Sequence, residues 1–317
     1  MNRAFIFLVP LLAQPLAAQE GDFQRGLSYY KQGQYQRAIE EFEKIVGEVP
    51  DYESGHRVLG DSYLQTGQHQ KAIESFQSAL RLKGDTYDSY YGLAVAYFNT
   101  GKFQEAAAAL TKGEEYALSP RDQYRLHQIR GSAYYNLGRF PEAIDELRSA
   151  VSVQRGNAPD LLQLGIAYFK IGDDSEAVKW LEQALAVDPN ASSAREYLSR
   201  IRYREALGLL DQGSYRQSVS LLRTHVNDHP QDGAARFNLG LALLFADDLP
   251  AAEEEFRRCA SLLPQNWEVH QRLGYIYEKQ ASYRQALSSY EKAEQLHPDA
   301  ANRESIERLK ERIRRAG

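Results

Sequence analysis

The chain lacks several features that would point to covalent chemistry or to a membrane. It has 317 residues but a single cysteine, Cys259, so no disulfide can form within it. Its 38 lysines and arginines are outnumbered by 43 aspartates and glutamates, which leaves a net charge of −5 and no basic excess for nucleic acid. Beyond one apolar run near the N-terminus, no stretch is long and apolar enough to span a membrane. The sequence therefore predicts no nucleic-acid partner and no integral membrane segment after that run.

Sequence motifs of enzymes are also missing. There is no glycine-rich phosphate loop, no Gly-x-Ser-x-Gly and no Cys-x-x-Cys. His225 and His229 could share a helix face, but the sequence offers no nearby acidic third ligand, and Pro230 tends to end the helix. Cys259 is expected to be a small buried packing residue. We therefore expect a non-enzymatic protein with no catalytic residue, no cofactor and no metal site.

A pattern of 34 residues repeats along almost the whole chain, with one spacing of 37 and one of 41. Each copy has a small residue, a second small residue twelve positions later, and a large apolar residue four positions after that. The first set is Gly26, Gly60, Ala94, Gly131, Gly165, Ala206, Gly240 and Gly274. The second is Ala38, Ala72, Ala106, Ala143, Ala177, Ser218, Ala252 and Ala286, and the third is Phe42, Phe76, Leu110, Leu147, Leu181, Leu222, Phe256 and Tyr290. A fixed period of this size indicates a solenoid of helix pairs.

The copy at 158–191 illustrates the local signals. Apolar residues at helical spacing run over 160–169 and again over 176–187. Gly172 ends the first helix, and Asp173 offers a side-chain oxygen to cap the second. Gly165 and Ala177 are expected to be small because the two helices approach closely there. In other copies, Pro141 and Pro250 mark the first turn of the second helix.

These residues resemble the tetratricopeptide repeat family. Leu-Gly-x-x-Tyr at 59–63 and 273–277 matches the family signature, and so do the late prolines Pro50, Pro189, Pro230, Pro264 and Pro298. Gly84 replaces the late proline in the second repeat, and Asp247 and Ala281 replace the turn glycine in the last two. The resemblance implies an all-α fold, a right-handed α-solenoid of antiparallel helix pairs.

The register divides the chain as follows. Residues 1–18 form a leader, 19–191 a block of five repeats, 192–198 a junction, 199–300 a block of three repeats, and 301–317 a capping helix. The eight repeats are 19–52, 53–86, 87–120, 124–157, 158–191, 199–232, 233–266 and 267–300. The junction has no glycine or proline, and seven residues make about two helical turns. We therefore expect one continuous helix through it, with a change in the groove at this point.

In the family, first helices line the concave face of the superhelix. One register position expected to point there holds Tyr30, Leu64, Phe98, Tyr135, Phe169, Leu210, Leu244 and Glu278, with Tyr91, Tyr203, Phe237 and Tyr275 flanking it. Aromatic side chains suit capture of a peptide. The alternative is that these residues pack between neighbouring first helices.

One binding site known in the family, for the C-terminal carboxylate of a partner, is absent from this sequence. Some tetratricopeptide domains clamp a C-terminal carboxylate with lysine and asparagine on successive first helices. The corresponding positions here are Phe23, Leu27, Arg57, Asp61, Tyr91 and Val95. A cytosolic chaperone-tail adaptor is therefore not expected.

Residues 1–18 have the features of a secretory signal peptide. Arg3 gives a short positive start, residues 4–13 are mostly apolar, and small residues precede Gln19. The run is too short for a transmembrane helix. We expect export, to a bacterial periplasm first and as a secreted protein second; the alternative is an apolar leader on a cytosolic chain.

The leading hypothesis is an exported scaffold or adaptor that binds a protein or peptide segment in the concave groove. The first alternative is a glycan- or cell-wall-binding accessory protein of an envelope assembly or export system, since aromatic rings stack on sugars. An enzyme is the third hypothesis, and no residue pattern favours it.

The leader predicts that the mature chain begins near Gln19. N-terminal sequencing of the native protein tests this. Detection of an intact Met1 on cytosolic protein would contradict export.

Overall fold

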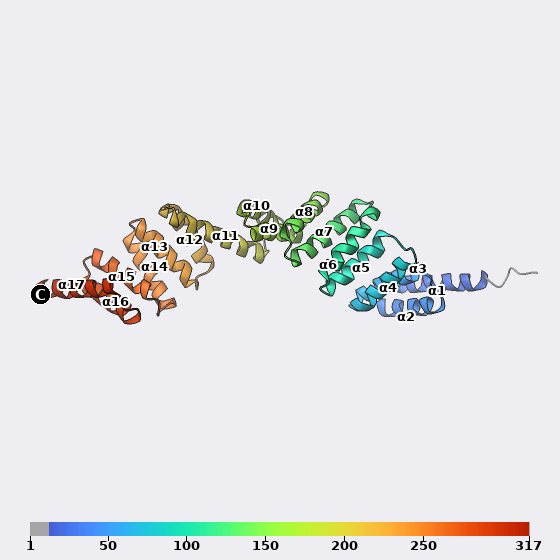
Figure 1. Ribbon diagram of the computed structural model, residues 1–317, viewed down its shortest axis with the longest axis horizontal. Coiled ribbons are helices and arrows are strands. Elements are labelled where there is room, and N and C mark those ends of the chain that lie inside the picture. Colours follow the sequence, from blue (N-terminus) through green and yellow to red (C-terminus); the bar gives the residue numbers. More distant parts are fainter. Residues whose placement is uncertain (1–12, 317) are drawn as a thin grey trace, which may run out of the picture. The chain divides into compact units, whose positions relative to one another are not determined.

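The computed structural model describes residues 13–316, and it describes side chains from residue 21 to residue 315. Within these residues every regular element is a helix (Figure 1). Residues 1–12 of the expected leader lie outside the described residues. The helices are α1 (Ala13–Lys31), α2 (Tyr35–Glu48), α3 (Glu53–Gln65), α4 (His69–Arg81), α5 (Tyr87–Asn99), α6 (Phe103–Gly113), η1 (Glu114–Tyr116), α7 (Pro120–Asn136), α8 (Phe140–Val153), α9 (Ala158–Ile171), α10 (Asp174–Val187), α11 (Ser192–Asp211), α12 (Tyr215–Asp228), α13 (Gly233–Phe245), α14 (Leu249–Leu262), α15 (Trp267–Lys279), α16 (Tyr283–Leu296) and α17 (Ala300–Ala316).

The chain divides into two compact parts, residues 1–194 (the N-terminal part) and 195–317 (the C-terminal part). The boundary falls within the junction 192–198. The junction itself is helical, because α11 runs without interruption from Ser192 to Asp211. The prediction of one continuous helix is confirmed, and its physical reason is the absence of a helix-breaking residue.

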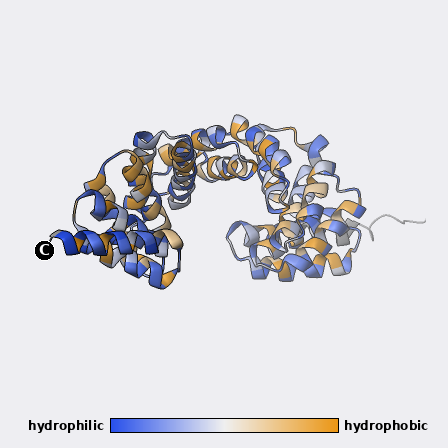
Figure 2. Cartoon of the chain, turned by 60° about the vertical axis from the view of Figure 1, so that its left-hand side comes forward, coloured by the Kyte–Doolittle hydropathy of each residue, from blue (hydrophilic) through white to orange (hydrophobic). Residues whose placement is uncertain are grey.

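Helix pairs stack in register within each part. In the N-terminal part, each odd-numbered helix packs on the even-numbered helix that follows it, and the first helices also contact one another, α1 with α3, α3 with α5, α5 with α7 and α7 with α9. In the C-terminal part, α13 packs on α14 and α15 on α16. Hydrophobic and hydrophilic residues are mixed along most helices, and the helix that ends at the C-terminus, α17, is mostly hydrophilic (Figure 2). The α17 residues Ile306 and Leu309 are nevertheless buried, as expected of a capping helix.

The repeating small residues make room for the large apolar residue of the same repeat. A Cβ atom added at Gly60 would lie 3.0 Å from the ring of Phe76, and one at Gly165 would lie 2.8 Å from Cγ of Leu181. Phe76 and Leu181 are fully buried. The two helices of a repeat therefore meet where one side chain is missing, and the opposite side chain fills the space.

The turn between the two helices of a repeat keeps its left-handed backbone conformation in the repeats that have no glycine there. Gly172 has a φ of 84°, and the substituted positions Asp247 and Ala281 keep φ values of 63° and 57°. Left-handed backbone costs an alanine roughly 1–2 kcal/mol more than a glycine. The last two repeats therefore preserve the family turn at the expense of some local strain.

Other local predictions are also confirmed. Pro141 and Pro250 lie in the first turns of α8 and α14. Asp173 caps α10 by accepting a hydrogen bond from the Glu176 N–H at 3.1 Å. Cys259 is fully buried, and burial raises the pKa of its thiol to about 11, which suits a packing role and not a nucleophile.

Replacing Gly165 by leucine should destabilise the protein by about 1–3 kcal/mol, because the new side chain overlaps Leu181. Gly47 is the matched control: it lies in α2, and a Cβ there would meet nothing within 4 Å. Denaturant unfolding of Gly165→Leu and Gly47→Leu measures the difference. Equal stability of the two variants would show that the crossing point is wrongly assigned.

Candidate functional site

The eleven expected groove residues all lie on first helices. Most are half-buried, while Leu244 is buried and Tyr275 is 43% exposed. They are Tyr30 on α1, Leu64 on α3, Tyr91 and Phe98 on α5, Tyr135 on α7, Phe169 on α9, Tyr203 and Leu210 on α11, Phe237 and Leu244 on α13, and Tyr275 on α15. In the N-terminal part, α1, α3, α5, α7 and α9 form a surface that we call the first-helix face.

Three aromatic residues of this set, Tyr30, Phe98 and Tyr135, each pack against one ring of the same repeat. Tyr30 meets Tyr35 edge to face at 5.4 Å between ring centroids, and Tyr135 meets Phe140 at 5.6 Å. Phe98 meets Phe103 in the same way at 5.2 Å. Each partner is the first residue of the second helix in the same repeat. These contacts fix the ring orientations, and the rest of each half-buried ring remains accessible.

In the C-terminal part, the corresponding residues make more internal contacts. The Tyr203 ring stacks on His225 at 4.6 Å, and its hydroxyl accepts a hydrogen bond from Nδ2 of Asn238 at 2.8 Å. Phe237 packs edge to face on Phe256 at 5.7 Å. Contacts within the C-terminal part therefore account for these two aromatic residues.

The first-helix face also carries a charged cluster that sequence analysis did not identify. It comes from three successive repeats. On α3, Nη1 of Arg57 lies 3.6 Å from Oδ2 of Asp61. On α5 and α7, Nη1 of Arg125 lies 3.9 Å from Oδ1 of Asp88, and its guanidinium carbon lies 4.0 Å from the centroid of the Tyr91 ring. The cluster places cations, carboxylates and an aromatic ring side by side.

Asp61 is the under-stabilised member of this cluster. Burial raises its pKa to about 6, and the charge of Asp88 acts in the same direction, while Arg57 and Arg125 oppose the rise. Burial also raises the pKa of the Tyr30 phenol, and the charge of Asp61 adds to this. Arg57 and Arg125 therefore compensate the ionised carboxylate of Asp61 only in part.

Tyr87 is the second under-satisfied group. Its side chain is 6% exposed, its ring lies 5.7 Å from that of Tyr91, and its buried hydroxyl has no hydrogen-bond partner among the described residues. Burial raises the pKa of this phenol, with the charges of Tyr91 and Asp88 contributing. A buried hydroxyl without a partner is unfavourable, so Tyr87 is a locally destabilising residue of this helix pair.

The same register position in the next repeat provides a comparison. There the hydroxyl of Tyr124 donates to Oδ2 of Asp160 at 2.8 Å and accepts from Gln128 and Asn157 at 2.8 and 2.9 Å. The residues that would serve Tyr87 in the same way are replaced: Leu126 holds the register position of Asp160, and Tyr91 holds that of Gln128. Leu126 and Tyr91 thus stand in place of two of the three partners that Tyr124 has.

The sequence carries a signal for this cluster. Arg57, Asp61 and Tyr91 stand where the carboxylate clamp would have its lysine and asparagine. Asp88 and Arg125 hold the same register position in successive repeats, so their opposite charges point to a contact between neighbouring first helices.

The histidine pair lies in a polar network of the C-terminal part. Nδ1 of His225 and Nε2 of His229 lie 2.9 and 3.1 Å from Oγ of Ser199, and Nε2 of His225 lies 3.3 Å from Oδ2 of Asp232. The expectation that no acidic group stands near the pair was wrong. The reason is that the turn after α12 brings Asp232, which also caps α13, back beside His225.

This network is nevertheless not a catalytic site. Ser199 is 5% exposed and lies in the middle of α11, so a substrate carbonyl cannot reach its hydroxyl. Among the described side chains, no group of three or more histidine, cysteine, aspartate or glutamate residues is arranged to hold a metal ion. The network joins α11, α12 and the start of α13.

No helix within residues 13–316 is both long enough and apolar enough to cross a membrane.

Family comparisons agree with this architecture. Profiles described as tetratricopeptide repeat match residues 23–85, 57–120, 91–161 and 203–267, and related ones match 134–201 and 268–299. The protein is thus an α-solenoid of the class that commonly serves as a non-catalytic scaffold for protein interactions. It belongs to the tetratricopeptide repeat family.

The curated relatives resemble only a segment of this chain. Cellulose synthase operon protein C of Komagataeibacter xylinus is 29% identical over 107 residues, which are 33% of this chain and 8% of that protein. Protein O-mannosyl-transferase TMTC1 of Homo sapiens is 25% identical over 192 residues, 58% of this chain and 21% of that protein. The chain thus matches only a small part of the length of either relative.

The solved structure of YrrB, described as a TPR protein with an unusual peptide-binding site, supports the fold. It has a TM-score of 0.50 and 17% identity over 55% of this chain and 89% of its own, and at this identity the likeness concerns the fold alone. The MamA protein is also similar, with a TM-score of 0.49 and 24% identity over 55% of this chain and 93% of its own.

Tyr87→Phe should leave the free energy of unfolding unchanged or raise it by up to about 1 kcal/mol, because an unpaired hydroxyl is removed. Tyr124→Phe is the matched control and should lower it by about 1–3 kcal/mol, since Asp160 is 2% exposed and loses a donor. Denaturant unfolding compares the two variants. A Tyr87→Phe variant as unstable as Tyr124→Phe would contradict the assignment of Tyr87 as unpaired.

Proposed function

We propose that this protein is a non-enzymatic scaffold whose first-helix face binds a segment of a partner protein around Asp61, Tyr91 and Arg125. The observation that carries the proposal is the partly exposed carboxylate of Asp61, which Arg57 at 3.6 Å compensates only in part and whose pKa burial raises to about 6. Natural proteins tolerate incompletely satisfied polar groups where a ligand completes them. Asp61 lies in the N-terminal part, on the same first-helix face as the half-buried rings of Tyr30, Tyr91 and Phe98.

The chemistry of the face favours a segment with a positively charged side chain. A lysine or arginine of the partner would add to the partial counter-charge that Arg57 supplies to Asp61. The half-buried rings of Phe98 and Tyr135 would contact apolar side chains of the segment. The family's usual role as an interaction scaffold supports this use of the first-helix face.

The site of action in this proposal is the bacterial cell envelope. Support comes from the leader pattern of residues 1–18, with its positive start, apolar run and small residues before Gln19. The periplasm is the first choice and secretion the second.

A second candidate is binding of a glycan or cell-wall polymer as an accessory protein of an envelope system. The half-exposed rings of Tyr30, Phe98 and Tyr135 favour it, since aromatic faces stack on sugars. The partial similarity to Cellulose synthase operon protein C also supports it. The charges of Asp61 and Arg125 favour the peptide as the first candidate.

Calorimetric titration separates the candidates. The probes are blocked nonapeptides with a central lysine or arginine, the same peptides with glutamine at that position, and cellulose and peptidoglycan oligosaccharides. The cationic peptides should bind more tightly as pH rises from 5 to 7, because Asp61 ionises near pH 6 in the free protein. Asp61→Asn should abolish this pH dependence, and Phe98→Ala with Tyr135→Ala should weaken binding at all pH values.

Stability provides the folding control. A raised pKa in the folded state means that Asp61 favours folding below its unfolded pKa and that this contribution is lost as pH rises through about 6. Asp61→Asn should therefore be at least as stable as the parent at pH 7.5. Binding of oligosaccharides instead of peptides would support the second candidate, and cationic peptides that bind equally to Asp61→Asn and the parent would overturn the peptide site.

A further inference from the structure

A groove on the opposite side of the N-terminal part differs in charge from others of its kind. Such a groove lies between the second helix of one repeat and the second helix of the next, with the intervening first helix as its floor. Four grooves of this kind, α2–α4, α4–α6, α8–α10 and α12–α14, have volumes of about 400, 370, 580 and 270 Å³. The α8–α10 groove is the largest of the four, and its volume is in the range of ligand-binding pockets.

The α8–α10 groove has cationic side chains without carboxylates. Arg148 and Arg155 line it together with apolar residues, and no aspartate or glutamate does. In the α12–α14 groove, by contrast, Arg236 pairs with Glu255 at 2.8 Å. In the α2–α4 groove, Lys71 lies 3.9 Å from Glu43. The α8–α10 groove therefore has a positive potential that its lining does not neutralise.

The two arginines are available for a ligand. Within residues 21–315, neither is among the side chains that form an ion pair or a side-chain hydrogen bond, and Arg148 acts on Glu176 only through its charge. Glu176 is the carboxylate that would compete with a ligand for Arg148, because the charge of Arg148 contributes to the lowering of the Glu176 pKa. That carboxylate is already occupied by the ammonium of Lys179 and the indole N–H of Trp180, at 2.9 Å each.

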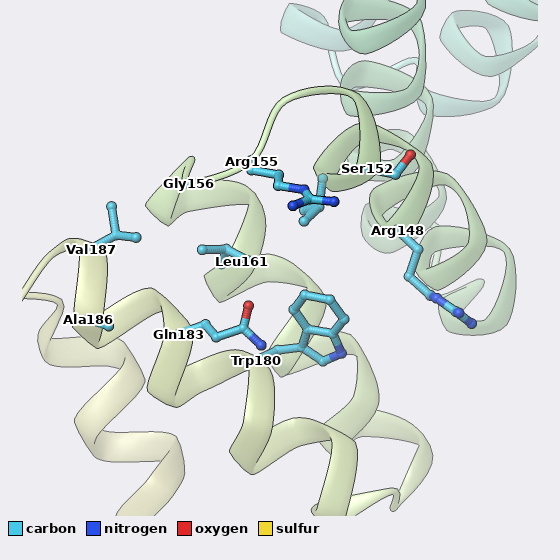
Figure 3. Close-up of a pocket in the computed structure, with 10 residues that line it drawn as sticks. Arg148, Ser152, Arg155, Gly156, Leu161, Trp180, Gln183, Ala186 and Val187 are labelled. Atoms are coloured by element: carbon cyan, nitrogen blue, oxygen red, sulfur yellow. The ribbon is translucent and has the colours of Figure 1, made fainter.

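The shape of the groove suits an apolar side chain beside an anion. Arg155 extends from the α8–α9 connection over the groove, and Trp180 and Gln183 face it from α10 (Figure 3). The bond from Trp180 to Glu176 holds the indole in place. Leu161 and Val187 add apolar surface, and Val187 is 48% exposed, so the slot is open to solvent.

Arg155 is also an unusual residue for its register position. It occupies the place of the late proline, and the eight repeats have Pro50, Gly84, Leu118, Arg155, Pro189, Pro230, Pro264 and Pro298 there. It is the only charged residue of the set. The next residue, Gly156, has a φ of 79°, a backbone conformation that favours glycine. The α8–α9 connection thus lacks the rigid proline of other repeats and has a guanidinium group over the groove instead.

We infer that the α8–α10 groove binds an acidic segment of a partner protein, one that has a large apolar side chain next to its carboxylates. Arginine pairs with carboxylates through two parallel hydrogen bonds, and tryptophan and arginine dominate the energetics of protein interfaces. The apolar walls disfavour a free inorganic anion, and the net charge of −5 disfavours a polyanion such as nucleic acid. This second surface is independent of the first-helix face.

Tryptophan fluorescence provides a direct test, because the chain has two tryptophans. Trp267→Phe in the full chain leaves Trp180 as the only reporter. The probes are blocked hexapeptides in which two glutamates flank one leucine, phenylalanine or isoleucine, with glutamine-for-glutamate and serine-for-apolar versions. Titration with the glutamate peptides should change the fluorescence emission of Trp180 until it saturates, and added salt should lower the affinity of these peptides.

The Arg155→Gln variant should bind the glutamate peptides with an affinity lower by about tenfold or more, as expected for the loss of a charge-assisted hydrogen bond. Arg155→Lys should restore part of the affinity, and Arg223→Gln, in the α12–α14 groove, is the matched control that should change nothing. Asp61→Asn should also have no effect, which separates this site from the first-helix face. Unchanged emission with every peptide, equal binding of the glutamine versions, or full affinity in Arg155→Gln would overturn the inference.

Discussion

The whole solenoid depends on one contact, in which a residue without a bulky side chain on the first helix accepts the large apolar residue of the second. Gly60 with Phe76 and Gly165 with Leu181 are two examples. The contact sets the distance between paired helices, and repetition of that distance sets how one pair stacks on the next. Because each repeat contacts mainly its neighbours, the other positions of a repeat are free to vary.

Function is expected where the repeats differ from one another. Tyr124 and Tyr87 share a register position, yet one hydroxyl is fully paired and the other has no partner among the residues that the structure describes. Arg155 replaces a proline and stands over the largest of the four grooves between second helices. The two proposed surfaces differ in charge, since Arg57 compensates Asp61 only in part on one, and Arg155 has no ion pair among the described side chains on the other. One chain could thus hold two segments of different charge.

The fold was predictable from the sequence because its signals are local and repeated. Gly172, Asp173 and Pro141 each act within one helix end, and the structure confirms all three. The charged cluster was not predictable in the same way, because it joins α3, α5 and α7 across three repeats. Burial of Asp61 and the missing partner of Tyr87 depend on which side chains neighbouring helices supply. The packing contacts of Tyr203 likewise depend on His225 and Asn238, which lie in other helices.

The central claim is that a partner segment occupies the first-helix face of the N-terminal part. Hydrogen–deuterium exchange of the full chain, with and without a bound cationic peptide, tests it most directly, because it reports protection helix by helix. Binding at this face should slow exchange in α3, α5 and α7 and leave α13 and α15 unchanged. Protection confined to α13 and α15, or to the second helices, would contradict it.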